Sequence, residues 1–147
     1  MAEQLTLGEL IRKLEPLVAV ERPEYATDPK VRLDFEYAYP VDLGSWRGVY
    51  ADLAISFTFG GYGMPGFREI DGYYKKPPPK TLVEFIKMLK WAIGQAYPGW
   101  KGGEFVMDES TPLWVANDGN SGNTAVVGVR DNEYEIVLLT AYHEYTG

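Results

Sequence analysis

The sequence predicts an α+β fold: a mainly antiparallel sheet of about five to six strands, with two helices packed on one face. Apolar residues recur at helical spacing after Thr6 and again after Thr81, whereas in most other stretches they alternate with polar residues, as in half-buried strands. The alternating stretches are separated mostly by intervals of hairpin length. The length of 147 residues predicts a single domain over 1–147.

Both predicted helices begin with a capping box, Thr6-Leu7-Gly8-Glu9 and Thr81-Leu82-Val83-Glu84. We expect the first helix over 7–15, where Pro16 ends it, and the second from 82 to about 96. The strings at 6–14 and 81–89 share the pattern Thr-Leu-x-Glu-(Leu/Phe)-Ile-(Arg/Lys)-x-Leu. This similarity is compatible with an internal duplication of a helix-then-strands unit, and also with convergence of two ordinary amphipathic helices.

The clearest strand pattern covers 49–59, where Val49, Leu53, Ile55 and Phe57 alternate with polar residues. Shorter candidates are 31–36, 104–107, 113–116, 124–129 and 134–140, with 130–133 as a hairpin turn between the last two. Two stretches rich in glycine, proline or asparagine predict loops at about 60–80 and at 117–123. The first is long for a passive connection and is expected to be a lid, a binding loop or an oligomer arm.

Composition excludes several classes of function. The chain has no cysteine, which removes disulfides, thiolate nucleophiles and cysteine-ligated metals. A net charge of −7 argues against binding to duplex nucleic acid, because that affinity comes largely from neutralising phosphates. No apolar run reaches the roughly 20 residues of a membrane span, and the acidic start Met1-Ala2-Glu3 is unlike a secretion signal. We therefore expect a cytoplasmic protein without a membrane partner.

Few residues carry a pattern typical of catalysis. The single histidine, His143, is adjacent to Glu144, but neighbouring strand residues point to opposite faces, which favours a histidine without a chemical role. Asp118-Gly119-Asn120 begins a faint calcium-loop pattern, yet Val129 stands where the twelfth-position acid is needed. Phosphate-loop and nucleophile-elbow motifs are absent. We expect no enzyme activity, no cofactor and no metal.

Paired carboxylates leave one catalytic alternative open. Asp34 with Glu36, and Asp108 with Glu109, could serve as acid and base in a small hydrolase. The same pairs also fit a solvated sheet face, which is the commoner arrangement. The hydrolase interpretation is therefore the weaker one.

A short unit occurs three times: an aromatic ring, a neighbouring cation, and a glycine or proline run within two residues. An arginine or lysine beside an exposed ring can pair a phosphate while the ring stacks on a base, and glycine amides can approach an anion closely. The expected ligand-binding residues are Trp46, Arg47, Gly48, Tyr50, Tyr74, Lys75, Lys76, Trp100, Lys101, Gly102 and Gly103. The alternative is that Trp46 and Trp100 anchor loops against the sheet while the cations face water.

The segment Gly44-Ser45-Trp46-Arg47-Gly48-Val49-Tyr50 resembles small proteins encoded by tailed bacteriophages and prophages. In those proteins a Ser-aromatic-Arg-Gly-x-Tyr strand precedes a threonine-capped helix and a Gly-aromatic-Lys-Gly-Gly-x-aromatic-x-Met segment, which here is Gly99 to Met107. The resemblance covers roughly residues 5–120, and its usual opening matches Leu7-Gly8-Glu9-Leu10. It implies a viral origin and supplies no catalytic residues.

These observations together predict a phage-encoded, non-catalytic binding protein in the cytoplasm of an infected bacterium. We expect it to sequester a nucleotide-like anionic small molecule, such as a host immune signal, and to form a homo-oligomer. The main alternative is an acidic, protein-binding inhibitor of a host defence system that mimics nucleic acid.

Overall fold

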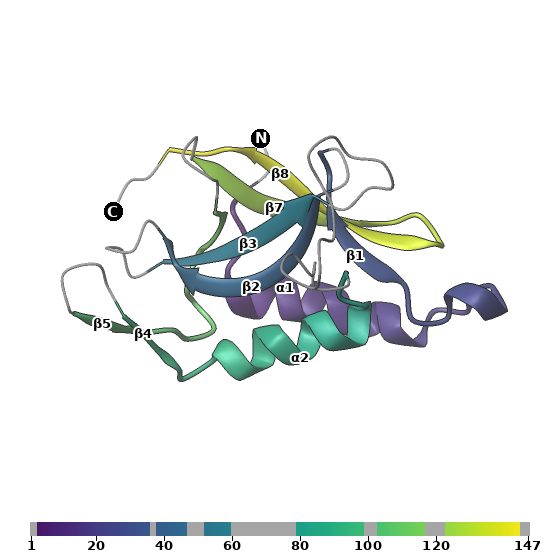
Figure 1. The fold of residues 1–147 in the computed structure, drawn as a ribbon, viewed down its shortest axis with the longest axis horizontal. Helices are drawn as coiled ribbons and strands as arrows, with labels where there is room; N and C mark the ends of the chain where they lie inside the picture. The colour runs from purple at the N-terminus through teal and green to yellow at the C-terminus, as the bar shows by residue number, and fades with distance from the viewer. Residues whose placement is uncertain are drawn as a thin grey trace, which may run out of the picture.

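A computed structural model describes residues 3–35, 38–46, 52–59, 79–98, 103–116 and 123–144 of the chain. Two α-helices and eight strands form its framework (Figure 1). The helices are α1 (Leu7–Leu14) and α2 (Leu82–Ala92), and two 3-10 helices, η1 (Glu15–Ala19) and η2 (Glu24–Ala26), follow α1. The strands are β1 (Lys30–Leu33), β2 (Ala38–Ser45), β3 (Leu53–Phe59), β4 (Ala96–Pro98), β5 (Glu104–Val106), β6 (Leu113–Val115), β7 (Thr124–Asp131) and β8 (Glu135–Tyr142).

Six strands form one mixed sheet in the order β1-β8-β7-β6-β3-β2. The pairs β2 with β3, β6 with β7 and β7 with β8 are antiparallel, whereas β1 with β8 and β3 with β6 are parallel. The α+β class is confirmed, but the expectation of a mainly antiparallel sheet is wrong. Both parallel pairings join strands far apart in the sequence, which local hairpin spacing does not reveal. The edge strands β1 and β2 also contact each other, so the sheet is nearly closed.

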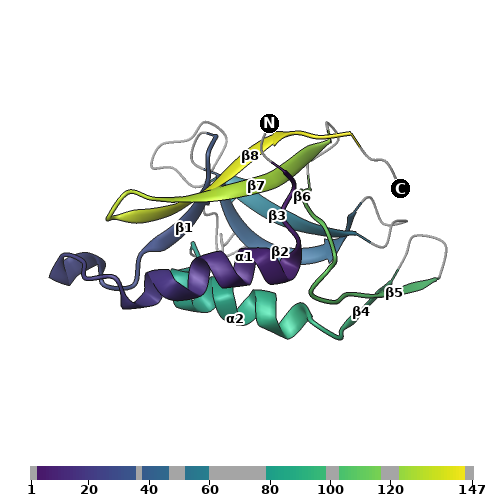
Figure 2. The same cartoon turned by 180° about the vertical axis from the view of Figure 1, so that it is seen from behind.

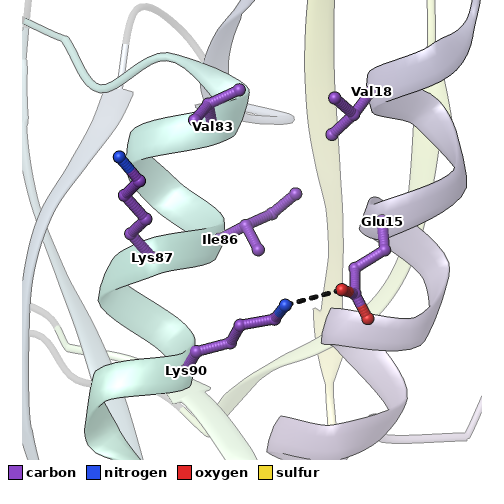
Figure 3. Close-up of a pocket in the computed structure, with 6 residues that line it drawn as sticks. All are labelled: Glu15, Val18, Val83, Ile86, Lys87 and Lys90. Atoms are coloured by element: carbon purple, nitrogen blue, oxygen red, sulfur yellow. Dashed lines mark ion pairs between the residues drawn. The ribbon is translucent and has the colours of Figure 1, made fainter.

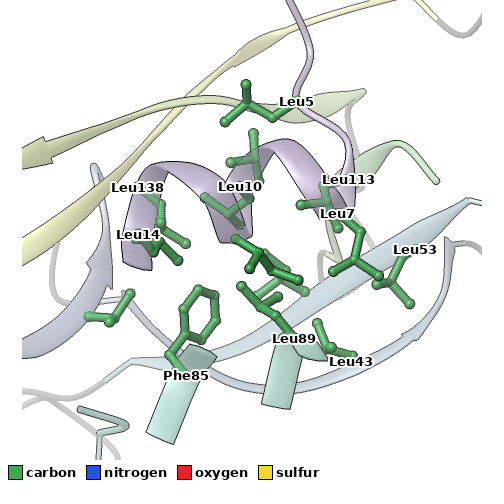
Figure 4. Close-up of a cluster of buried hydrophobic side chains, with 14 of the residues drawn as sticks. Leu5, Leu7, Leu10, Leu14, Leu43, Leu53, Phe85, Leu89, Leu113 and Leu138 are labelled. Carbon is green, nitrogen blue, oxygen red and sulfur yellow. The ribbon is translucent and has the colours of Figure 1, made fainter. Parts of the chain in front are cut away.

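The two helices lie side by side on one face of this sheet (Figures 1 and 2). Each begins at its predicted capping box: Thr6 Oγ1 accepts from Glu9 N at 3.3 Å, and Thr81 Oγ1 accepts from Glu84 N at 3.4 Å. The buried helix residues meet the inner residues of the strands in one apolar core (Figure 4). Its helical members are Leu7, Leu10, Ile11, Leu14, Leu82, Phe85, Ile86, Leu89 and Ala92.

The structure differs from the sequence-based prediction at three elements. Strand β2 is not among the predicted strands, and its Pro40 is accommodated at a sheet edge, next to a register shift between Pro40 and Asp42. Helix α2 ends at Ala92 rather than near 96, because Gly94 adopts a left-handed φ of 81° and turns the chain. The predicted strand at 104–107 leaves the main sheet and pairs with β4 as a separate two-stranded ribbon.

The chain contains two units with the same connectivity, α1-β1-β2-β3 and α2-β6-β7-β8, with the β4–β5 ribbon inserted after α2. In each unit the second and third strands form an antiparallel hairpin. The first strand of each unit runs parallel to the third strand of the other unit, as β1 does with β8 and β6 with β3. Exchanging the two units therefore leaves the strand order around the nearly closed sheet unchanged.

Equivalent backbone hydrogen bonds support this correspondence. Leu7 N donates to Thr111 O over 2.8 Å before β6, and Leu82 N donates to Pro29 O over 2.7 Å before β1. The register shift within β2 is matched by one in β7, between Val126 and Gly128. The correspondence between the two helix strings thus extends to the topology of the strands.

Neither helix in the described part of the chain is long and apolar enough to cross a membrane.

Candidate functional site

A second, smaller cluster of buried side chains lies on the face of the sheet opposite the helices. Its centre is Trp114 of β6, whose neighbours Leu113 and Val115 point into the main core. Trp114 is in register with Ala54 of β3 on one side and with Ala125 of β7 on the other. The two small side chains leave room for the indole between the strands.

Trp46 covers this indole in a parallel stack. The two ring centroids are 4.0 Å apart, the planes differ by 7°, and each residue is only 1% exposed. The backbone N–H of Trp46, directly after β2, donates to the carbonyl of Asp52, directly before β3, over 2.8 Å. This backbone bond joins the end of β2 to the start of β3.

Asp52 is the half-buried carboxylate of the cluster. Its Oδ2 accepts a hydrogen bond of 2.7 Å from Nε1 of Trp114. Burial raises the pKa of Asp52 above its usual range, and the bond from Trp114 opposes that shift only in part. A carboxylate placed this way can accept further hydrogen bonds from a ligand N–H.

His143 completes the cluster from the end of β8. Its ring meets Trp114 edge to face, with centroids 6.2 Å apart and planes at 77°. The backbone N–H of His143 donates to Asn123 O over 2.8 Å, which fixes the chain beyond β8 to the start of β7. Nδ1 lies 3.1 Å from the backbone oxygen of Glu144, so the contact with Glu144 runs through its main chain.

Of the eleven expected ligand-binding residues, two lie in the described part of the chain. Trp46 is buried against Trp114, so the expectation that its ring is exposed for stacking on a ligand is wrong: the indole is used in packing. Gly103 is exposed before β5, and a Cβ added there would meet no atom within 4 Å. The others lie outside the described residues: Arg47, Gly48, Tyr50, Tyr74, Lys75, Lys76, Trp100, Lys101 and Gly102.

The paired carboxylates that could have formed a hydrolase site have structural partners where they are described. Asp34 accepts from Thr140 N at 2.8 Å and from Thr140 Oγ1 at 2.6 Å, joining the end of β1 to β8. Asp108 accepts from the N–H and hydroxyl of Ser110, bonds that hold its pKa below the usual range. Glu36 lies outside the described residues. Within the described ranges, no group of three or more acids or histidines could hold a metal ion.

Comparison of the chain with models of known protein families, with curated proteins and with solved structures finds no match. The geometry of the site is therefore the basis for the functional argument.

A groove of about 360 Å³ lies on the helical side of the molecule (Figure 3). Val18 of η1 and Val83 and Ile86 of α2 give it apolar walls. Lys90 reaches across it to Glu15, with Nζ 2.7 Å from Oε2. An ion pair that spans the groove stabilises the contact between η1 and α2, and its half-exposed position makes this contribution small.

Sequence reasoning missed the roles of Asp52, Trp114 and His143. A usable signal was present in Leu53-Ala54-Ile55 and Leu113-Trp114-Val115, where the middle residue must face away from the core that its neighbours enter. An alanine and a tryptophan at such positions are unusual for a solvated sheet face and indicate a covered one. The partners of the cluster depend on parallel pairing of β3 with β6, which the sequence did not reveal.

Proposed function

We propose that the protein is a non-catalytic binding protein that captures a nucleotide-like anionic small molecule beside the Trp46–Trp114 cluster. The observation that supports this is the placement of Asp52: a half-buried carboxylate with a raised pKa, held by Trp114 at the rim of an aromatic cluster. Half-buried carboxylates on an otherwise rigid aromatic base are typical of sites that recognise a ligand by a few placed polar groups.

In this proposal the stacked indoles of Trp46 and Trp114 support the site, and the residues around them contact the ligand. In the proposal Asp52 accepts hydrogen bonds from the N–H groups of a base, and the half-buried imidazole of His143 lies beside it against Trp114. Trp46 fixes the start of the segment that carries Arg47, Gly48 and Tyr50. In the proposal Arg47 pairs the anionic group and Tyr50 stacks on the base.

The remaining expected residues, from Tyr74 to Lys76 and from Trp100 to Gly103, supply further cations and backbone amides in this proposal. Assembly into a homo-oligomer, with the stretch at 60–80 closing over a neighbour, would exclude water from the bound molecule. The resemblance to phage proteins supports a source in an infected bacterial cytoplasm and a host immune signal as the captured molecule.

A retention experiment tests the proposal. The purified protein is incubated with a panel of mono-, di- and cyclic nucleotides, separated from free ligand, denatured, and the released molecules are identified by mass spectrometry. Retention of an intact nucleotide supports capture. Release of an altered nucleotide would show an enzyme and overturn the non-catalytic assignment, and no retention would reject small-molecule capture.

Two variants assign the retained ligand to the site. Asp52→Asn keeps an acceptor for Trp114 but loses the carboxylate, and Arg47→Ala removes the proposed anion partner. Both are expected to lower retention by about tenfold or more, because a charged group in a desolvated site contributes ~1.5–3 kcal/mol. The matched controls are Asp28→Asn and Arg12→Ala on other surfaces, which should retain ligand like the parent protein.

A further inference from the structure

Two exposed tyrosines contact each other beside the turn that joins β7 to β8. Tyr25 of η2 and Tyr134 stack with centroids 6.1 Å apart and an interplanar angle of 13°. They are 81% and 51% exposed, so a large part of each side chain meets solvent. Two large rings in contact with each other and with water form an apolar surface that a monomer does not need for its core.

A buried arginine joins the two segments that carry the tyrosines. Arg22, whose side chain is 1% exposed, donates from Nη1 and Nη2 to the two carboxylate oxygens of Asp131 over 2.7 and 2.8 Å. It also donates to Leu17 O and Glu133 O over 3.0 and 3.3 Å. Arg22 thereby joins the segment before Tyr25 to the turn that carries Tyr134, which reduces the entropy that binding would cost.

The turn itself holds a conformation that L-residues rarely adopt. Glu133 has φ 79°, and its N–H donates to Asp131 Oδ1 over 2.9 Å. A left-handed glutamate costs of the order of 1 kcal/mol and persists only where the surroundings enforce it. The next two residues are held in the same turn, because the N–H groups of Tyr134 and Glu135 both donate to Oδ1 of Asn132.

The charge around the tyrosines is negative. Glu21, Glu24 and Glu133 are exposed, and among the residues that the structure describes no ion pair engages them. Two of the nearby arginines are paired, Arg22 with Asp131 and Arg32 with Glu135, whereas Arg130 of β7 is exposed. Open tyrosine faces bordered by unpaired carboxylates are complementary to guanidinium groups, which stack on aromatic rings and pair with carboxylates.

We propose that the Tyr25–Tyr134 surface is a docking site for a basic, arginine-containing segment of a partner protein. An arginine stacks on the open ring faces while its charge is balanced by Glu24 and Glu133. Tyrosine anchors on a preorganised base are typical of interface hot spots. The site is separate from the Asp52 cluster, because Tyr134 precedes β8 whereas His143 of that cluster follows the other end of β8.

Titration calorimetry with three peptides of equal length tests the proposal: an arginine–glycine, a lysine–glycine and a glutamate–glycine repeat. The arginine peptide is expected to bind most tightly and the lysine peptide more weakly, because the planar guanidinium stacks better than an ammonium. The glutamate peptide should not bind. Equal affinity for the arginine and lysine peptides, or binding of a single-stranded oligonucleotide at this surface, would overturn the proposal.

Matched variants locate the binding. The double variant Tyr25→Ala, Tyr134→Ala is expected to lower affinity for the arginine peptide by about 5- to 30-fold. Glu133→Gln should lower it and reduce its dependence on salt. Tyr142→Ala, a change at a 69% exposed tyrosine at the other end of β8, and Glu104→Gln should leave it unchanged. Wild-type affinity in the double variant, with native circular dichroism, would reject the surface.

Discussion

Nε1 of Trp114 donates to Oδ2 of Asp52 over 2.7 Å where β6 meets β3, and the equivalent position where β1 meets β8 has an ion pair. There Arg32 of β1 donates from Nε to Oε1 of Glu135 in β8 over 3.0 Å. The equivalence follows from the register, since Leu53 pairs with Leu113 as Ile136 pairs with Val31. The carboxylate of Glu135 is thus balanced by a cation, whereas the carboxylate of Asp52 lies beside a neutral indole.

We therefore predict that Asp52→Asn lowers ligand binding without lowering the free energy of unfolding. The pKa of Asp52 is raised, so the folded protein holds the proton more tightly than the unfolded chain and the ionised carboxylate lowers stability at neutral pH. The asparagine variant should therefore be at least as stable as the parent at neutral pH. Its advantage should shrink as pH falls through the raised pKa towards 3.8, where the parent carboxyl becomes protonated. Urea unfolding across this range measures the difference.

Asp52→Ala is the control for that variant. It removes the acceptor and leaves the indole N–H of Trp114 without this bond, at an expected loss of ~1–3 kcal/mol in the free energy of unfolding. If Asp52→Asn and Asp52→Ala lost stability equally, the carboxylate of Asp52 would serve the stability of the fold rather than the binding of a ligand.

Replacement of Trp46 by alanine should cost ~3–5 kcal/mol in the free energy of unfolding, because it removes a fully buried ring that stacks on Trp114. Trp91→Ala is the matched change at a 63% exposed tryptophan of α2 and should stay within ~0.5 kcal/mol of the parent. Chemical denaturation followed by circular dichroism compares the two. A loss of less than 1 kcal/mol in Trp46→Ala would contradict the packing role of this indole.

How far the sequence predicted this molecule depends on the range of the interaction concerned. The capping boxes at Thr6 and Thr81 act within four residues and were predicted correctly, as was the turn between the last two strands. The neighbours of Trp114 depend on β3 and β6 lying parallel across some sixty residues of chain, and no local pattern encodes that pairing. The same limit made Trp46 look like a ligand-stacking ring, because its partner was not known.

We expect the ion pair between Arg22 and Asp131 to stabilise the fold at neutral pH and to lose this effect at acidic pH. The bonds from Arg22 hold the pKa of Asp131 below its usual range, so this stability is present above the unfolded pKa and is lost as pH falls through the folded one. Arg22→Met should cost ~1.5–3 kcal/mol at neutral pH, because it removes the charged hydrogen bonds to Asp131, which keeps the bond from Glu133 N–H. The gap between parent and variant should narrow on acidification in pH-dependent urea unfolding. A gap independent of pH would mean that the arginine acts by packing alone.

Gly8 should be irreplaceable at the contact between α1 and the turn before β6. A Cβ there would lie 2.9 Å from Cβ and 3.0 Å from the backbone oxygen of Glu109, and the Gly8 N–H donates to that oxygen over 2.8 Å. Backbone atoms cannot move aside cheaply, so Gly8→Ala should lose ~1–3 kcal/mol despite the better helix propensity of alanine. Gly44→Ala on β2, where an added Cβ meets no atom within 4 Å, is the control and should be nearly neutral. Thermal unfolding of both variants decides the matter: a neutral or stabilising Gly8→Ala would show that the helix and the turn can separate without loss, and the close approach would then play no part in positioning β6.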